Sequence, residues 1–252
     1  MITSTFSLKG RTALITGASG GLGAHFAAVL AAAGAHVILA ARRKGLLDTV
    51  AQRIRASGGD CATAILDVSS AASIEALDEV LPRVDILVNN AGVVHDAPAL
   101  DQTEADWDSV IDTNLKGMFL LAGAVGRAMR ARGGGGSIIN IASILGLRQA
   151  GSVLPYAVSK AGVIQLTKQM GLELARFGIR VNALAPGYLE TELNSAFWQS
   201  DAGKAMLRRI PQRRLGRLED LDGPLLLLAS DASAYMTGSV ISVDGGHLVS
   251  TL

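Results

Sequence analysis

The sequence predicts a single doubly wound α/β domain, a parallel sheet of about seven strands with helices on both faces. Strand-like and helix-like segments alternate along the 252 residues. The strand-like segments are almost entirely apolar, which is typical of strands buried on both faces. A glycine cluster lies between the first strand and the first helix, at the edge where open parallel sheets bind ligands.

The expected strands are short, and most are separated by helix-like segments. In order, they are Arg11–Ile15, His36–Ala40, Cys61–Leu66, Asp85–Val88, Ser137–Ile141, Ile179–Leu184 and Val240–Val243. Strands joined through helices pair in parallel by right-handed crossovers. These segments are therefore expected to form one sheet.

The expected helices include an alanine-rich segment and several with helix-like spacing of apolar residues. They cover His25–Ala33, Leu46–Ser57, Ser73–Leu81, Asp106–Ala131, Tyr156–Phe177 and Leu221–Ala229. Gly34 ends the first helix and the glycine run 133–136 ends the fourth, because glycine suits a helix C-terminus. The alternation resumes in phase after that run, so residues 1–252 are expected to form one domain.

Composition argues against several classes of protein. The 23 Lys and Arg nearly balance 22 Asp and Glu, a net charge of +1 that argues against nucleic-acid or membrane-surface partners. The apolar fraction of 49% argues against disorder. A single cysteine, Cys61, excludes an internal disulfide, so a cytoplasmic location is expected, with Cys61 as a small buried residue. Met1–Lys9 does not resemble a signal peptide, and Phe26–Ala41, the most apolar stretch, is too short to span a bilayer.

The glycine cluster is the segment LITGASGGLG, which contains Gly17, Gly21 and Gly23. Glycine permits positive φ and lets the backbone approach a ligand closely. The helix that follows presents free N–H groups and a partial positive charge, which suit a pyrophosphate. The spacing G-x-x-x-G-x-G differs from the G-x-G-x-x-G fingerprint, and the cluster alone is also compatible with an ordinary turn. Its place between a strand and a helix favours dinucleotide binding.

Further motifs follow in order along the chain. NNAG occupies Asn89–Gly92, Ser143 follows the fifth strand, YAVSK spans Tyr156–Lys160, and a Pro-Gly pair stands at 186–187. Together with TGASGGLG, these motifs resemble the short-chain dehydrogenase/reductase family over nearly the whole chain. The resemblance implies a Rossmann-like fold and a nicotinamide-dependent oxidoreductase.

A reactive set of four residues is expected: Asn114, Ser143, Tyr156 and Lys160. Tyr156 and Lys160 are four residues apart on one expected helix, so they share a face. A free tyrosine has a pKa of about 10, and a nearby ammonium is expected to lower the pKa of Tyr156 toward neutrality. Ser143, at the carboxyl end of a strand, is expected to hold the substrate oxygen. The resemblance implies that Asn114 helps anchor a water chain to the lysine.

Each of these residues is also compatible with a purely structural role that involves no catalysis. Tyr156 and Lys160 are also compatible with a helix surface pair, Ser143 with a turn or cap, and Asn114 with a local hydrogen-bonding role. Their occurrence together, in the family's order and behind a glycine turn, favours the catalytic interpretation.

The resemblance and the end of the second strand define the expected cofactor site. The expected contacts are Gly17, Ser19, Gly21, Leu22, Gly23, Ala41, Arg42, Arg43, Asp67, Val68, Asn89, Ala91, Gly92, Tyr156, Lys160, Pro186, Gly187, Leu189 and Thr191. Where an acid would bind a ribose 2′-hydroxyl, the chain has Ala41 followed by two arginines. Guanidinium groups match a phosphate, so NADP(H) is favoured over NAD(H). Solvated arginines, or an arginine stacked on adenine with NAD(H), are the alternatives.

Residues 188–217 are the least regular segment and are expected to form a lid over the substrate; the alternative is a pair of amphipathic helices packed on the core. The expected substrate contacts are Ser143, Leu145, Val153, Tyr156, Tyr188, Phe197 and Trp198. The pocket residues are mostly apolar, so an apolar ketone or secondary alcohol is favoured over a charged sugar acid. His95 is expected to be a loop residue near the cofactor, and the 4 histidines show no metal-ligand pattern, so no metal is expected.

The expected function is hydride transfer between a nicotinamide and a ketone or secondary alcohol, with Tyr156 as general acid or base. The alternatives are a cofactor-sensing protein without turnover, a narrower 3-ketoacyl-type reductase, and a lyase or epimerase that reuses its cofactor. The resemblance also implies a homotetramer in which the final strand and tail pair across a two-fold axis. The motifs do not identify the substrate, its stereochemistry or the direction of reaction.

Overall fold

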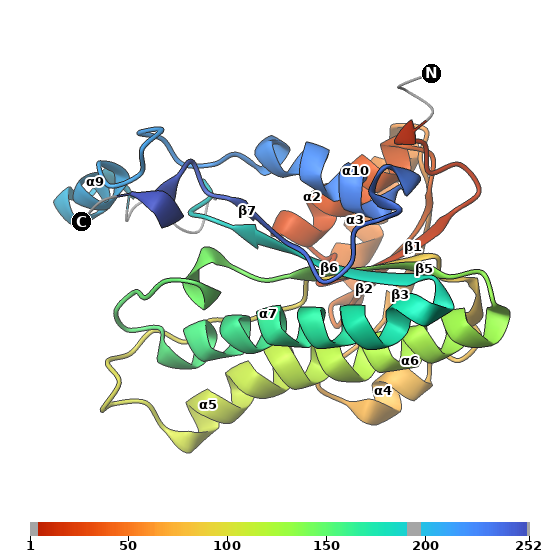
Figure 1. Cartoon of the computed structure of the whole chain (residues 1–252), viewed down its shortest axis with the longest axis horizontal. Coiled ribbons are helices and arrows are strands. Elements are labelled where there is room, and N and C mark those ends of the chain that lie inside the picture. Colours follow the sequence, from red (N-terminus) through yellow and green to blue (C-terminus); the bar gives the residue numbers. More distant parts are fainter. Residues whose placement is uncertain (1–4, 191–197, 251–252) are drawn as a thin grey trace.

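The chain forms a seven-stranded parallel sheet covered by helices on both faces, as the sequence predicts (Figure 1). The computed structural model describes residues 5–190 and 198–250. The strand order is β3-β2-β1-β4-β5-β6-β7, and every neighbouring pair is parallel. The strands are β1 (Thr12–Thr16), β2 (His36–Ala41), β3 (Asp60–Ile65), β4 (Ile86–Asn89), β5 (Gly136–Ile141), β6 (Ile179–Pro186) and β7 (Val240–Val243).

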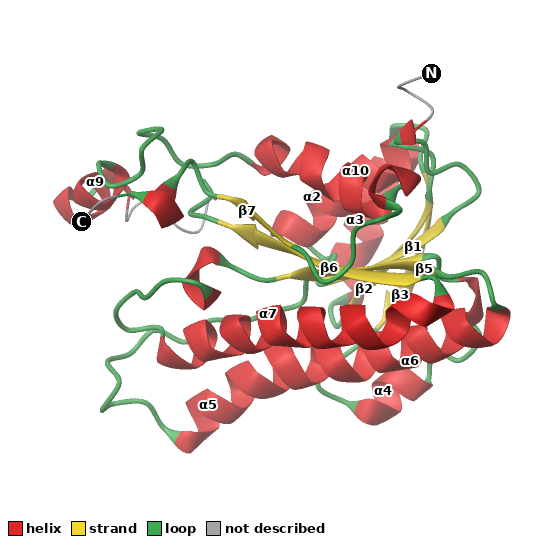
Figure 2. Ribbon diagram, viewed as in Figure 1, coloured by secondary structure: helices red, strands yellow, loops and turns green. Residues whose placement is uncertain are grey.

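The helices form two layers, one on each face of the sheet (Figure 2). One layer contains α2 (Gly21–Ala32), α3 (Lys44–Ala56) and α10 (Asp222–Ala229). The other contains α4 (Ala71–Glu75), α5 (Glu104–Ile111), α6 (Gly117–Arg132) and α7 (Leu154–Leu174). A further helix, α9 (Asp201–Leu207), belongs to the segment that follows β6.

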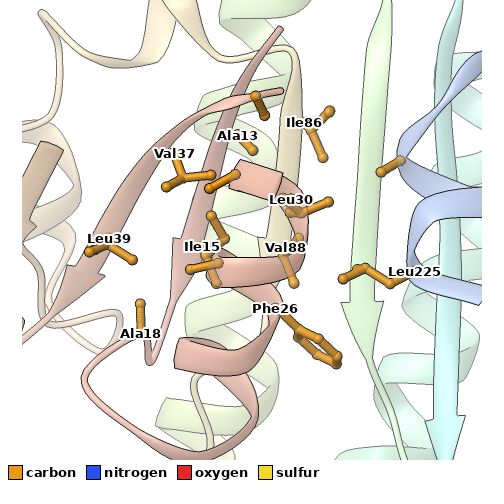
Figure 3. Close-up of a cluster of buried hydrophobic side chains, with 14 of the residues drawn as sticks. Ala13, Ile15, Ala18, Phe26, Leu30, Val37, Leu39, Ile86, Val88 and Leu225 are labelled. Atoms are coloured by element: carbon orange, nitrogen blue, oxygen red, sulfur yellow. The ribbon is translucent and has the colours of Figure 1, made fainter. Parts of the chain in front are cut away.

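The central strands send alternate side chains into two hydrophobic layers, because successive strand residues point to opposite faces. Ile15 and Val88 pack with Phe26 and Leu30 of α2 on one face (Figure 3). Leu14 belongs to the cluster on the other face, together with buried side chains of α6. Burying each large apolar side chain contributes roughly 1.5–3 kcal/mol. This packing holds the strand ends, which carry the candidate site, in a fixed frame.

The helix expected at Ser73–Leu81 is wrong in extent. α4 ends at Glu75, turns follow, and a 3₁₀ turn begins at Leu81. Ser70 caps α4 by accepting the Ser73 N–H at 3.2 Å. Just beyond Ala76 the backbone bonds span three residues instead of four: the Leu77 N–H donates to the Ile74 carbonyl and the Asp78 N–H to the Glu75 carbonyl, so the chain tightens into turns.

The long helix expected at Asp106–Ala131 is interrupted by a π-helical turn at Asp112–Lys116, which separates α5 from α6. Gly117 begins α6 where an added Cβ would lie 2.7 Å from the Val68 carbonyl oxygen, so only glycine permits this approach. Isolated π turns occur frequently at functional sites. Asn114 lies in this one.

Two more helices differ from expectation at their ends. α2 begins at Gly21 rather than His25, and α7 begins at Leu154 rather than Tyr156. Pro155 occupies the first turn of α7, where its missing N–H carries no penalty. None of the helices in the described ranges is both long and apolar enough to cross a membrane.

Candidate active site

The glycine turn between β1 and α2 leaves room for a ligand against the backbone. Gly17 has φ +66° and Gly21 has φ +51°, values that favour glycine. An added Cβ on Gly23 would overlap the Gly17 carbonyl oxygen, and one on Gly17 would lie 2.9 Å from Asn90 Nδ2. Leu22 packs against the core and anchors the start of α2. The helix N-terminus can therefore present its N–H groups to a phosphate.

The NNAG segment supports this turn from the neighbouring strand. The Thr16 hydroxyl accepts the N–H groups of Asn90 and Ala91, both at 2.9 Å, and Asn90 Nδ2 donates to the Thr16 carbonyl at 2.9 Å. Asn89 is buried, and its Nδ2 donates to Asn140 Oδ1 at 3.0 Å inside the sheet. Asn89 therefore ties β4 to β5, whereas Asn90 and Thr16, which sequence reasoning did not select, hold the turn. In the sequence, only their places within the TGASGGLG and NNAG motifs indicated that Thr16 and Asn90 have a role here.

A cavity of about 190 Å³ lies between the glycine turn and the ends of β2 and β3. Predicted cofactor residues form most of its wall: Gly17, Ser19, Ala41, Arg42, Arg43, Asp67, Val68, Ala91 and Gly92. Arg43 Nη2 donates to the Ser19 hydroxyl at 3.2 Å. Hydrogen bonds from Ser69 and the charge of Arg42 hold the pKa of Asp67 below its usual range despite partial burial. Glycine backbone, two guanidinium groups and one carboxylate thus meet in one hollow, a set that fits the adenosine and phosphates of a dinucleotide.

The carboxyl end of β6 supplies another part of the predicted cofactor site. Pro186 is the last residue of the strand, and the Gly187 N–H donates to the Val243 carbonyl at 2.9 Å. A Cβ on Gly187 would lie 2.8 Å from Asp244 Cα, so the close approach to β7 requires glycine. Leu189 forms an isolated bridge with the 212–217 segment. Thr191 lies outside the described residues.

Ser143, Tyr156 and Lys160 are brought together at the carboxyl end of β5. The Ser143 hydroxyl accepts the Leu145 N–H at 3.1 Å and hydrogen-bonds the Tyr156 side chain. Lys160 is buried, and its Nζ donates to the Ile141 carbonyl at 2.6 Å. The same Nζ lies 5.5 Å from the centre of the Tyr156 ring. One turn of α7 thus places a cation beside a phenol that already contacts a serine.

The pKa of Tyr156 shifts opposite to the expectation drawn from Lys160. Burial raises the pKa of Tyr156, the hydrogen bond with Ser143 lowers it, and Tyr188 raises it. Burial also lowers the pKa of Lys160 to about 8. Desolvation dominates because it penalises the charged form of each group. The phenol therefore stays protonated at neutral pH and is suited to donate a proton.

Asn114 connects the NNAG segment with α7. Its Oδ1 accepts the Val93 N–H at 2.8 Å, and its Nδ2 donates to the Val93 carbonyl at 2.8 Å and to the Ser159 hydroxyl at 3.2 Å. The Ser159 hydroxyl donates to the Tyr156 carbonyl at 2.7 Å. The buried amide thus positions the backbone at Tyr156, and none of these bonds reaches the Tyr156 hydroxyl or Lys160 Nζ.

The predicted substrate wall is only partly covered by the described residues. The Tyr188 ring centre lies 5.4 Å from that of Trp198 and 5.6 Å from that of His247. Val153 immediately precedes α7, and Phe197 lies outside the described residues. His247, to which sequence reasoning assigned no role, packs against Tyr188 because the C-terminal 3₁₀ turn folds back onto that ring.

His95 contacts an aspartate near the surface rather than the reactive set. Its Nε2 lies 3.0 Å from Asp106 Oδ1 at the start of α5. Within the described ranges, no group of three or more His, Cys, Asp or Glu is arranged to hold a metal.

Comparison with known proteins identifies the family. Residues 17–247 match a family model described as enoyl-(acyl carrier protein) reductase. The 2-dehydro-3-deoxy-D-gluconate 5-dehydrogenase of Dickeya dadantii is 39% identical over 253 residues, covering 98% of this chain and 99% of that protein. The chain belongs to the short-chain dehydrogenase/reductase family.

Two other members of the short-chain dehydrogenase/reductase family illustrate the range of relatives. The 3-oxoacyl-[acyl-carrier-protein] reductase of Thermotoga maritima is 39% identical over 246 residues, covering 96% of this chain and 99% of that protein. The structure of a gluconate 5-dehydrogenase from Burkholderia cenocepacia, in complex with NADP and tartrate, is 39% identical with a TM-score of 0.93 and covers 100% of both chains. The chain is accordingly an NAD(P)-dependent oxidoreductase that acts on CH–OH groups or the corresponding ketones.

Proposed function

We propose that this short-chain dehydrogenase/reductase uses NADP(H) to interconvert a ketone and a secondary alcohol in a small molecule, with Tyr156 transferring the proton. The observation that carries this proposal is the meeting of Ser143, Tyr156 and Lys160 at the carboxyl end of β5. This is the sheet edge that also carries the glycine turn. A sensor without turnover has no need of a buried lysine beside a phenol, so the cluster favours an enzyme.

Each side chain in the cluster has a distinct task. Tyr156 donates its proton to the carbonyl oxygen during reduction and accepts it during oxidation. The Ser143 hydroxyl holds that oxygen and shares its developing charge with the phenol. Lys160 favours the phenolate once it forms, and Asn114 positions the backbone of α7. The nicotinamide, when bound, supplies or accepts the hydride.

The preference for NADP(H) rests on the end of β2. Ala41 stands where an acid would repel a 2′-phosphate, and Arg42 and Arg43 face the cavity beside the glycine turn. A phosphate dianion offers oxygens to both guanidinium groups, whereas a ribose hydroxyl offers only one weak acceptor. The bond between Arg43 and Ser19 holds one guanidinium at the mouth of the turn.

The relatives act on different classes of substrate: some are gluconate-type dehydrogenases and others are 3-oxoacyl-[acyl-carrier-protein] reductases. The apolar substrate expected from the sequence depended on the mostly apolar pocket residues, among them Leu145 and Val153, and did not take His247 into account. A polar wall beside Tyr188 favours a small polar substrate, and the 3-oxoacyl reductase remains the second candidate.

We also propose a homotetramer in the cytoplasm. The surface groove along α6 and α7 is lined largely by apolar side chains and exposes Phe119 by 54%, so it offers a contiguous apolar surface that another subunit could cover. The lone cysteine, Cys61, is buried and free, as suits a reducing compartment. Light scattering at micromolar concentration tests the assembly, and a monomer would contradict it.

The function is tested by following absorbance at 340 nm with NADPH and NADH. The panel contains aldonic acids and simple secondary alcohols with the oxidised cofactors, and ketones and 3-oxoacyl thioesters with the reduced ones. We expect turnover of at least one substrate class, with a lower KM for NADP(H). Cofactor binding without turnover on the whole panel would contradict the enzyme assignment.

A further inference from the structure

His247 carries a buried nitrogen that lacks a hydrogen-bond partner among the described residues. The residue is 4% exposed, and Nδ1 is the unpaired atom. Its ring packs against Tyr188 at 5.6 Å between centres. Buried polar atoms are rarely left unpaired, so this nitrogen has hydrogen-bonding capacity that the described residues leave unused.

A second polar group lies on the same wall. Arg148 is half-buried, and its Nη1 donates to the main-chain carbonyl of His247. Arg11, Arg132 and Arg214 pair with aspartates, whereas the ion pairs formed among the described residues do not include Arg148. A guanidinium has five N–H donors, so most of those on Arg148 are available to a ligand.

Among the described residues, the acid whose charge acts on His247 is Asp244, and it is already engaged. Asp244 is near enough to raise the pKa of His247, while burial and the charges of Arg148 and Arg209 lower it. The carboxylate of Asp244 accepts the N–H groups of Gly246 at 2.9 Å and Leu248 at 2.7 Å. The Asp244 carboxylate thus caps the C-terminal turn, and its hydrogen bonds from Gly246 and Leu248 fix its orientation.

This pair lies next to the reactive set. Arg148 follows Ser143 by five residues on the segment that leaves β5. Tyr188 contacts the His247 ring, and its hydroxyl is near enough to Tyr156 to raise the pKa of that phenol. Tyr188 therefore links His247 to the reactive set, and Arg148 is joined to His247 by its bond to the main-chain carbonyl.

We propose that Arg148 and His247 bind the carboxylate of a hydroxy-acid or keto-acid substrate while its reacting carbon lies at Tyr156. A carboxylate accepts hydrogen bonds from a guanidinium and from an imidazole N–H, which supplies the partner that Nδ1 lacks. This inference rests on the proposed function and narrows its substrate to small organic acids. It replaces the apolar substrate expected from sequence.

The test compares an acid with its neutral counterpart, D-gluconate and D-gluconamide, with NADP⁺ in excess. The wild type should have a higher kcat/KM for gluconate. Arg148→Met should lower kcat/KM for gluconate by about 10- to 100-fold, chiefly through KM, and change that for gluconamide less than threefold. Arg148→Lys, which keeps the charge, should recover part of the loss. His247→Phe, which keeps the ring contact with Tyr188, should cost about 10-fold on gluconate alone.

Arg127→Met, on the exposed face of α6, is the matched control and should behave as wild type. NADPH affinity, measured by fluorescence, should be unchanged in every variant, which verifies the fold. Equal losses on acid and amide would show that Arg148 only ties the C-terminal turn, and would overturn the inference. Turnover of thioesters but not of gluconate would overturn it and leave the proposed function intact. Absence of NADP(H)-linked turnover with any compound would overturn both.

Discussion

The two ends of the candidate site are built in different ways. At the dinucleotide end, backbone packing limits key positions: Gly23 has no room for a Cβ, and the Thr16 hydroxyl is hydrogen-bonded to three backbone groups of β4 and the NNAG segment. At the substrate end, side chains make the wall, and one of them, His247, keeps an unpaired nitrogen.

This difference indicates that cofactor recognition depends on the backbone, whereas substrate recognition depends on side chains that can vary. A phosphate-binding turn depends on close backbone approach, which few sequences allow, so a motif can reveal it. A substrate wall depends on which side chains converge from distant segments, as Arg148, Tyr188 and His247 do in the substrate site that we propose. Four substitutions test this contrast, beginning with the largest expected effect.

Tyr156→Phe tests the position between the dinucleotide end and the substrate end of the site. Removing the hydroxyl deletes the proton donor, so kcat should fall by about 1,000-fold, while the Kd for NADPH stays within about threefold. Stopped-flow turnover and fluorescence titration measure the two quantities. Tyr235→Phe, at a fully exposed position, is the control. Retained turnover in the Tyr156 variant would refute the role of the phenol.

Lys160→Met tests the cost of the buried cation. Burial lowers the pKa of Lys160 from 10.5 to about 8, so between these pH values the unfolded chain binds more protons and stability rises with pH. The free energy of unfolding of the wild type, relative to the variant, should rise by about 2 kcal/mol between about pH 7.5 and pH 10. Urea denaturation measures this difference.

The exposed Lys168→Met on the same helix should show no such change. A difference in the free energy of unfolding between the wild type and Lys160→Met that stays constant over this pH range would mean that Lys160 keeps its ordinary pKa.

Gly23→Ala tests the backbone-limited end. The new Cβ would overlap the Gly17 carbonyl oxygen, so we expect a loss of about 2 kcal/mol in stability and weaker NADPH binding. Gly223→Ala, in α10 with open space around it, should be neutral or slightly stabilising. Thermal denaturation measures the stability of each variant, and cofactor titration measures its affinity for NADPH. If the two alanine variants were equally stable and bound NADPH equally well, the turn would not be limited by packing.

Arg43→Ala tests cofactor choice with the smallest expected effect. Losing one charged contact to a 2′-phosphate should weaken NADPH binding by about 10-fold and leave NADH binding unchanged. The exposed Arg53→Ala on α3 is the control. Equal weakening of both cofactors would indicate that Arg43 stacks on adenine instead.

The sequence was sufficient for the sheet, the glycine turn and the Ser143–Tyr156–Lys160 cluster, because each depends on local patterns whose order follows the chain. It was not sufficient for the π turn at Asn114, which arises where α6 packs closely on the β3–α4 loop. The direction of the Tyr156 pKa shift was also missed. The four-residue spacing shows that an ammonium is near, but not that burial raises the pKa of Tyr156 and lowers that of Lys160. His247 was missed because only the folded C-terminal turn brings it to Tyr188.

The central claim is that the Tyr156 hydroxyl faces a reacting carbonyl between Ser143 and the nicotinamide. A crystal structure with NADP⁺ and a bound substrate or inert analogue tests this most directly. We expect the substrate oxygen within hydrogen-bond distance of both hydroxyls, with the nicotinamide ring against the carbonyl carbon and the 2′-phosphate at Arg42 and Arg43. A nicotinamide separated from Tyr156 by packed side chains would contradict it.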